Sequence, residues 1–393
     1  MQVLTLSHDA ATGWSRSLPS ELDSPQTLVL VFGAPACGQD AAPLQALKAA
    51  LPQAVHAGCS TAGEIFEGEV RDGSLSVAVV RFEGTRLALA QTAVADRDDS
   101  QAAGERLAVQ LQQPDLRAVL VFSEGVQVNG TALVDAMTRQ LPPGVAIAGG
   151  LAGDGDRFGS TWVWDGQVPR SRCIVAVGLC GDRLQVGLGS EGGWSDFGPQ
   201  RRITRAEGQV LYELDGRPAL DLYKAYLGDL AHRLPAAALR FPLSVRKVQA
   251  SEAGQECPDG SGLGEPLVRT ILAVDEAQRA LVFAGDIPQG GMARLMRVNH
   301  LGLIEAAGRA LSGAVAMAEP SGPALCLSVS CVGRRLVLGE HTEEELEAAG
   351  PLLPAGSGHV GFYSYGEISP AGARASRLHN QTLTVSVLWE RPA

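Results

Sequence analysis

The pattern of hydrophobic positions opens with a fully apolar run and then changes to helical spacing. Leu28–Phe32 is apolar at every position, which is typical of a strand buried on both faces. After a loop of glycine and proline, Ala42–Leu51 has leucines three and four residues apart, which predicts a helix with one apolar face. A glycine-rich turn at Gly58–Glu64 and a second apolar segment, Ser76–Phe82, complete a strand–helix–turn–strand unit.

The same unit recurs about 90 residues further along the chain. Four features return in the same order: the tetrapeptide 29–32 as 119–122, the helical spacing as Leu133–Leu141, Ala57-Gly58 as Ala148-Gly149, and the strand 77–79 as 175–177. Each match is short, but their common order favours a duplicated architecture.

The C-terminal third has a similar order. Leu325–Ser330 predicts a strand, Thr342–Ala349 a helix, and Leu383–Leu388 a closing strand. Between the predicted helix and the last strand, Gly361–Ile368 aligns with Gly58–Ile65, and four of the eight positions are identical. The sequence therefore predicts a further copy of the unit near the C-terminus.

Strands that alternate with helices predict an α/β fold. The alternating polarity of Leu383–Leu388 indicates sheet faces that are only half apolar, so we expect mixed sheets covered by helices. Asp215-Gly216-Arg217-Pro218 is a turn signal and our predicted boundary between two domains. The prediction is an N-terminal extension at 1–27, a first domain at 28–217 and a second at 218–393. Irregular loops are expected in Arg233–Pro266, which is rich in glycine, proline and polar residues.

Composition and charge narrow the function. The 393 residues are 45% hydrophobic and 19% charged, as in a folded globular protein, and the net charge of −11 argues against nucleic acid as a partner. Seven scattered cysteines without a CxxC pair favour a reduced, cytoplasmic chain without a metal site. We expect no signal peptide at the N-terminus and no membrane insertion, because no run of about 18 apolar residues occurs.

The motif Gly58-Cys59-Ser60-Thr61-Ala62-Gly63-Glu64-Ile65 resembles the signature of the FIST N-terminal domain. Other segments resemble further parts of the two FIST domains, in the order of the family: Phe122–Gly125, Asn129-Gly130, Gly149–Asp154, Phe158, Gly193–Gly198, Thr204, Glu213–Gly216 and Pro218-Ala219 for the N-terminal domain, and Cys331–Arg334, Gly361–Ile368 and His379–Thr382 for the C-terminal domain. The resemblance covers residues 28 to 388.

This resemblance implies a sensory protein of signal transduction rather than an enzyme. Such modules are thought to bind small ligands, with amino acids proposed, and some bacterial members are haem-binding nitric oxide sensors that act on histidine kinases. We therefore expect a cytoplasmic sensor for a small molecule. No kinase, cyclase or helix-turn-helix module is recognisable in this sequence, so we expect the output to pass through a separate partner, with a histidine kinase as one candidate.

The candidate ligand residues combine the glycine turns with nearby polar side chains. They are Gly58, Cys59, Ser60, Thr61, Gly63, Glu64, Gly149, Gly150, Asp154, Cys331, Arg334, Tyr363, Tyr365, Gly366, Glu367, His379 and Asn380. Successive amides in a glycine turn can cradle a carboxylate or phosphate, a glutamate can receive an amino group, and an arginine can clamp a carboxylate. The alternative for each is structural: the glycines only turn the chain, and the polar side chains fix loops.

Three other readings stay open at this point. A haem would need an axial histidine, and nothing ranks the seven candidates at positions 8, 56, 232, 300, 341, 359 and 379. A cysteine hydrolase or acyl-transfer enzyme would use Cys59, three residues after His56, or Cys331. A pure interaction scaffold would bind no ligand.

If the Gly58 and Gly361 segments descend from one unit, they should approach one another or line one cleft.

Overall fold

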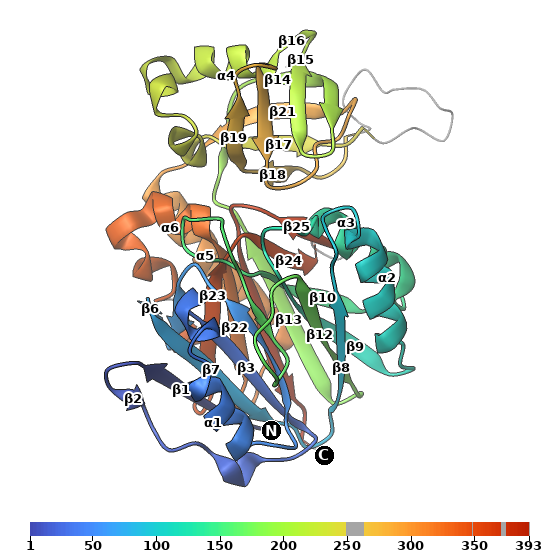
Figure 1. Cartoon of the computed structure of the whole chain (residues 1–393), viewed down its shortest axis with the longest axis vertical. Helices are drawn as coiled ribbons and strands as arrows, with labels where there is room; N and C mark the ends of the chain where they lie inside the picture. Colours follow the sequence, from blue (N-terminus) through green and yellow to red (C-terminus); the bar gives the residue numbers. More distant parts are fainter. Residues whose placement is uncertain (249–262, 348, 371–374, 393) are drawn as a thin grey trace.

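The computed structural model describes residues 1–248, 263–347, 349–370 and 375–392, which form a mixed α/β structure in two units. The body consists of residues 1–194 and 298–392 and contains three six-stranded sheets. The upper unit consists of residues 195–297 and contains one eight-stranded sheet. It lies at the top of Figure 1, above the body. Both chain termini lie at the opposite end of the molecule.

The first sheet is built from the N-terminal repeat. In order across the sheet, its strands are β11 (Val163–Trp164), β4 (Val55–Ser60), β3 (Thr27–Gly33), β7 (Ser74–Arg81), β1 (Gln2–Asp9) and β2 (Gly13–Trp14). Strands β3 and β4 are parallel, and α1 (Ala42–Ala50) joins them as the sequence predicted. The predicted N-terminal extension supplies β1, which pairs with β7 over eight residues.

The second and third sheets repeat this arrangement. In order, the second contains β25 (Ser376–His379), β24 (Gly366–Pro370), β10 (Ala146–Leu151), β9 (Leu116–Ser123), β12 (Cys173–Cys180) and β8 (Arg86–Ala93). The third contains β13 (Leu184–Glu191), β26 (Leu383–Glu390), β22 (Leu325–Cys331), β23 (Gly358–Ser364), β5 (Glu64–Phe66) and β6 (Glu69–Arg71). Each has one parallel pair, β9 with β10 and β22 with β23, next to antiparallel strands.

The three repeats exchange one strand each in a cycle. After its glycine turn, the first repeat sends β5 to pair with β23 in the third sheet, and the third repeat sends β24 to pair with β10 in the second. The second repeat sends β11 to pair with β4 in the first sheet. The predicted recurring unit is therefore present three times, and the exchange ties the three copies into one body.

One hydrophobic core lies between the inner faces of the three sheets. Phe32, Phe122 and Phe362 meet there, with ring centroids 4.8 to 6.3 Å apart. Alternate residues of the same strands face outward: Val29 and Val31 lie with the leucines of α1 in a separate cluster. Both faces of β3 are buried, which agrees with the unbroken apolar run at its residues 28–32.

Helices cover the outer faces of the second and third sheets. The second is covered by α2 (Ser100–Leu111) and α3 (Gly130–Gln140), and the third by α5 (His300–Ala318), with α6 (Val332–Leu338) at the end of β22. By length and composition α5 could cross a membrane; in the structure it packs against β13 and β26, and seven of its residues are buried.

The prediction of a helix at Thr342–Ala349 is wrong. The segment contains a 3₁₀ turn at Glu343–Glu345, and α7 (Ala349–Leu352) begins only at its end. Glu345 is drawn inward to a buried arginine, and its acidic neighbours would repel one another along a regular helix.

The upper unit has its own sheet, helix and core. In order, the sheet contains β18 (Leu267–Arg269), β17 (Leu243–Arg246), β21 (Met292–Arg297), β14 (Ser195–Glu207), β15 (Val210–Leu214), β20 (Ala280–Phe283) and β19 (Ile271–Asp275), and β16 (Arg217–Pro218) also pairs with β15. With α4 (Ala219–Leu227) it encloses one hydrophobic cluster. The turn predicted at Asp215-Gly216 joins β15 to β16, with positive φ at both residues. The predicted loop region 233–266 includes β17, and its part at 249–262 lies outside the described residues.

Candidate functional site

The three glycine turns meet at one place in the body. Each turn donates one backbone N–H to the next, which closes a ring of three hydrogen bonds. The pairs are Ala62 N–H to the Tyr363 carbonyl (2.8 Å), Tyr365 N–H to Leu151 (3.1 Å) and Gly153 N–H to Ser60 (3.0 Å). The predicted approach of the Gly58 and Gly361 segments is confirmed, since β5 also pairs with β23 at Gly361.

The repeated glycine lies inside the strand before each turn, not in the predicted turn itself, and the neighbouring strand requires it: Gly58 is in β4, Gly149 in β10 and Gly361 in β23. A Cβ atom on Gly58 would lie 1.9 Å from the Val31 carbonyl oxygen, and one on Gly149 would lie 2.0 Å from that of Val121. Gly361 is equally close to the Ser328 carbonyl, at 1.8 Å. Close packing of parallel backbones therefore accounts for these glycines without a ligand.

Glu64 and Glu367 hold equivalent, buried positions in two of the turns. Glu64 accepts a hydrogen bond from Thr61 and two from Ser74, one from its N–H and one from its hydroxyl. Glu367 accepts the same set from Ser364 and Thr382. Burial raises the pKa of both carboxyls to about 7, although these hydrogen bonds act in the opposite direction. Through these hydrogen bonds, each buried carboxyl group holds its own turn in place.

Asp154 and Tyr365 close the turn of the second repeat. The tyrosine hydroxyl donates to the Asp154 carboxylate, and the Phe158 ring stacks on Tyr365 with centroids 4.3 Å apart. Burial disfavours the charged carboxylate, yet the N–H groups of Ser160 and Gly159 and the tyrosine hydroxyl keep the pKa of Asp154 below its usual value. Gly150, beside this turn, packs against Val329 and Phe362 in the core.

Arg334 and Tyr363 belong to a buried polar cluster around Glu345. Arg334 is fully buried and donates to the Glu345 carboxylate through Nε (3.0 Å) and Nη2 (2.8 Å). The Tyr363 hydroxyl donates to the other carboxylate oxygen at 2.7 Å. Arg334 therefore does hold a carboxylate, but through two nitrogens on one oxygen rather than a two-oxygen clamp, and the carboxylate is the protein's own.

Neither candidate cysteine is placed as a nucleophile. Cys59 and Cys331 are buried, and burial raises the pKa of both thiols far above the usual value. His56, the predicted base, bonds the Leu51 carbonyl at 2.8 Å and stacks edge-on against Trp164. The arrangement does not support thiolate chemistry.

The predicted polar cluster after β25 lies at the junction of the two units. His379 bonds the Ser369 carbonyl at 3.1 Å, and burial lowers its pKa to about 4. Asn380 is 1% exposed, and neither amide atom has a hydrogen-bond partner among the described residues. Ligand contact stays a prediction for all the residues chosen from the sequence. Apart from those of Asn380, their polar side-chain atoms are mostly bonded within the protein.

The strongest candidate pocket lies elsewhere, between the body and the upper unit. It has a volume of about 550 Å³. The body lines it with α3 and β25, and the upper unit lines it with β17, β18 and the segment 286–288. Figure 1 shows β18 directly above β25 at this junction. Pockets of this size between two structural units are usual ligand sites.

Arg269 is the central feature of this junction pocket. It is only 2% exposed, and its guanidinium donates to three backbone carbonyls: Asp286 (3.2 Å), Val268 (3.3 Å) and Leu378 (3.3 Å). No carboxylate of the described residues pairs with it. Burial lowers the pKa of Arg269 to about 10, so it stays charged at neutral pH. A buried cation held by long carbonyl contacts is electrostatically underpaired.

Acidic side chains lie at a second side of the same pocket. Asp135 projects from α3 and makes no hydrogen bond or ion pair with any described residue. Glu265 and Asp286 also line the pocket, and the Thr131 hydroxyl there is buried without a partner in the described chain. The pocket thus offers one occupant a buried cation and nearby carboxylates, of which Asp286 and Asp135 favour the charged form of Arg269.

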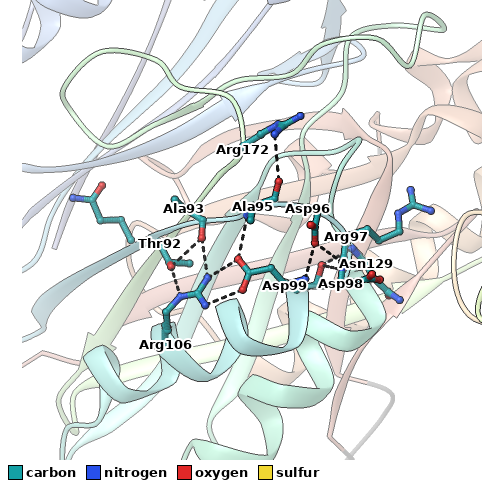
Figure 2. Close-up of polar contacts among 12 residues, drawn as sticks. Thr92, Ala93, Ala95, Asp96, Arg97, Asp98, Asp99, Arg106, Asn129 and Arg172 are labelled. Atoms are coloured by element: carbon teal, nitrogen blue, oxygen red, sulfur yellow. Dashed lines mark hydrogen bonds and ion pairs between the residues drawn. The ribbon is translucent and has the colours of Figure 1, made fainter.

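A hydrogen-bond network around the start of α2 (Figure 2) continues through Asn129 to the pocket residue Asp286. Asp99 at the start of α2 accepts two bonds of 2.9 Å from Arg106, and the next residue, Ser100, accepts the N–H of Asn129 at 2.8 Å. Asn129 caps α3 and donates to the Asp286 carboxylate at 3.1 Å. Asp286 in turn bonds Arg269 through its carbonyl, so the network positions both sides of the pocket.

Sequence reasoning missed this pocket because its residues are far apart in the chain. One local signal exists: Arg269 stands in the segment Leu267–Leu272, whose other residues are apolar apart from Thr270, and a charged residue is unusual there. That signal indicates a buried arginine but not its surroundings. The partners come from residues 131–139, 286–288 and 375–378, which only the packing of the two units brings together.

Two known proteins are similar to this chain over about two thirds of its length. An uncharacterised protein of Methanocaldococcus jannaschii is 26% identical over 277 residues, which cover 66% of this chain and 51% of that protein. The chain thus matches about half the length of that relative. An uncharacterised protein of Mycobacterium tuberculosis is also 26% identical over 277 residues, 68% of this chain and 67% of that protein.

Among solved structures, cyanuric acid hydrolase from A. caulinodans aligns over 100% of this chain and 99% of its own, with 10% identity and a TM-score of 0.32. A likeness of this size supports no inference about activity. The family comparison is decisive: a model of the FIST N domain matches residues 27–217, and one of the FIST C domain matches residues 219–370. The chain belongs to the FIST family, whose domains are associated with signal transduction.

Proposed function

We propose that this protein is a cytoplasmic sensor that binds a small polar molecule in the junction pocket. The observation that carries the proposal is Arg269, a buried and underpaired guanidinium in a pocket of about 550 Å³. Keeping such a cation out of water without a carboxylate costs several kcal/mol. A ligand anion would offset that cost, which is why the site favours a bound state.

An amino acid is the ligand that fits this arrangement best. Its carboxylate would accept hydrogen bonds from Nη2 of Arg269, because Nε and Nη1 already donate to backbone carbonyls. Its ammonium group would lie near Asp135, which has no partner among the described side chains. A site with both charges distinguishes a zwitterion from a simple anion, because each missing group leaves one protein charge unpaired.

The other readings have less support from the geometry. No histidine is among the described residues that line the junction pocket, so it offers no axial ligand for haem. The thiols considered for a hydrolase are buried with raised pKa values. The six described cysteines are free, in agreement with a reducing compartment.

A thermal-shift screen tests the proposal. The full chain is heated with each of the twenty L-amino acids, with acetate and succinate, and with haem. We expect one or a few amino acids to raise the Tm, since a ligand that binds only the folded state adds stability. A screen in which no amino acid raises the Tm would overturn the proposal, and a shift with haem alone would support the haem alternative.

A further inference from the structure

The two units of the chain have separate hydrophobic cores. The core of the upper unit contains residues from Ile203 to Leu295, and the large clusters of the body contain none of them. In a small cluster where the chain passes between the units, Leu239 of the upper unit packs with residues of the body that include Trp194 and Leu303. Units that share so little apolar surface can rotate relative to one another.

The chain crosses between the units at two adjacent points. It enters the upper unit at Ser195 and leaves it at Arg297, and these residues pair directly as the ends of β14 and β21. The preceding segment is anchored to the body, because Arg334 donates to the Gly192 carbonyl at 2.7 Å and Trp194 to that of Gln381 at 2.8 Å. The strand ends at Ser195 and Arg297 are therefore the positions where a hinge between the units would lie.

Polar contacts hold the two units together around the junction pocket. Asn129 of the body bonds Asp286 of the upper unit at 3.1 Å, and Arg269 reaches down to the Leu378 carbonyl at 3.3 Å. Arg97 also bonds Gln209 across the gap. Nearby, the side chains of Thr131, Thr270 and Asn380 contain buried polar atoms without partners in the described chain. This side of the junction is weakly held and incompletely satisfied.

We propose that a ligand carboxylate bound by Arg269 fastens the upper unit to the body, so that occupancy of the junction pocket sets the position of the upper unit about the hinge. This inference rests on the proposed function and adds how the signal leaves the site. Arg269 comes from β18 of the upper unit, whereas Asp135 and Arg377 come from α3 and β25 of the body. A ligand that contacts both sides binds the closed arrangement better and shifts the population towards it.

Arg269 is the specificity-determining residue in this scheme, and Gly285 positions it. A Cβ atom on Gly285 would lie 2.9 Å from the Arg269 Nε atom, so an alanine there would displace the guanidinium while leaving its charge. Arg294 offers a matched control, since it lies in the same sheet with its side chain 40% exposed and paired to Asp196 on the surface.

Hydrogen–deuterium exchange on the full chain tests the inference. The probes are the twenty L-amino acids, each compared with its α-carboxamide, which lacks the carboxylate. With an amino acid that raises the Tm, we expect about tenfold slower exchange in peptides containing Asn129 and Asp286, and no such change with its carboxamide. Small-angle scattering of the same samples should show a smaller maximum dimension when the amino acid is bound.

The variants separate the possible failures. Arg269→Met and Gly285→Ala should both lose the exchange protection, and Arg294→Met should keep it. If Arg269→Met does not fold, Gly285→Ala and the comparison of the amino acid with its carboxamide on the wild type test the inference. Binding by calorimetry without protection across the junction would overturn the coupling and leave the proposed function standing. Undiminished protection by the amino acid in a folded Arg269→Met would overturn the role of Arg269. If no amino acid binds, the proposed function itself falls.

Discussion

The ring of glycine turns and the junction pocket both bury charged groups, but they treat them in opposite ways. In the turns, Glu64 and Glu367 each receive three hydrogen bonds from hydroxyl and backbone donors, and Arg334 has a carboxylate partner. In the pocket, Arg269 has only carbonyls at 3.2 Å or more. A satisfied charge stabilises the fold, whereas an underpaired charge beside open volume is available to a ligand.

The largest effect should come from breaking the buried pair in the body. Arg334→Met leaves the Glu345 carboxylate buried without its cation, and we expect a loss of about 3–5 kcal/mol in the free energy of unfolding. Urea unfolding measures it. The neighbouring Arg335→Met is the control: its side chain is 24% exposed and pairs with an exposed aspartate, so about 1 kcal/mol should be lost. Equal losses would show that burial of the pair is not what matters.

The two buried glutamates should make stability depend on pH. Their folded pKa of about 7 exceeds the ordinary value of 4.5, so their contribution is fully present below pH 4.5 and is lost as pH rises through 7. Each should cost up to about 3 kcal/mol over that range. Glu64→Gln and Glu367→Gln should each flatten the curve of unfolding free energy between pH 5.5 and 8.

The histidines His56, His359 and His379 give the opposite slope at lower pH. Burial lowers their pKa values to about 4, so their contribution is present above pH 6.5 and is lost as pH falls towards 4. Comparing each glutamine variant with the wild type at the same pH cancels this term. A glutamine variant that keeps the wild-type slope above pH 5.5 would contradict the assignment to the turns.

In the pocket, removing the charge should weaken binding more than it weakens the fold. Arg269→Met should lose about 10–100-fold in affinity for an amino acid that raises the wild-type Tm, since the buried charged contact is lost. The unliganded variant should lose much less stability than Arg334→Met, because the loss of three carbonyl contacts is offset by the removal of an underpaired buried charge. Calorimetry and thermal unfolding measure the two. A large drop in unliganded Tm would place Arg269 with the structural charges of the turns.

The smallest effect concerns the support of the pocket. Asn129→Ala removes the cap of α3 and the contact to Asp286, at a cost of about 1 kcal/mol and a further loss of ligand affinity. Asn299→Ala removes a similar cap from α5, away from the pocket, and should lose stability alone. If the two variants bind an amino acid equally well, the Asn129–Asp286 contact does not position the site.

The sequence alone determined the repeated unit, its apolar strands and its glycine turns. Leu28–Phe32 had to be a buried strand because it is apolar at every position, and the shared order of motifs indicated copies that would meet. These features are local, since period, turn chemistry and repetition are written in neighbouring residues. The exchange of β5, β11 and β24 between copies was not visible, because strand pairing depends on contacts hundreds of residues apart.

Only the tertiary structure decided which polar residues are satisfied. Glu64, Glu367 and Arg334 looked like ligand groups in the sequence, and their partners Ser74, Thr382 and Glu345 became known only from the fold. Arg269 was not among the residues chosen from the sequence, and the fold left it without an ion-pair partner among the described carboxylates. The physical reason is that the cost of a buried charge is set by everything around it in space, and a sequence specifies only its neighbours along the chain.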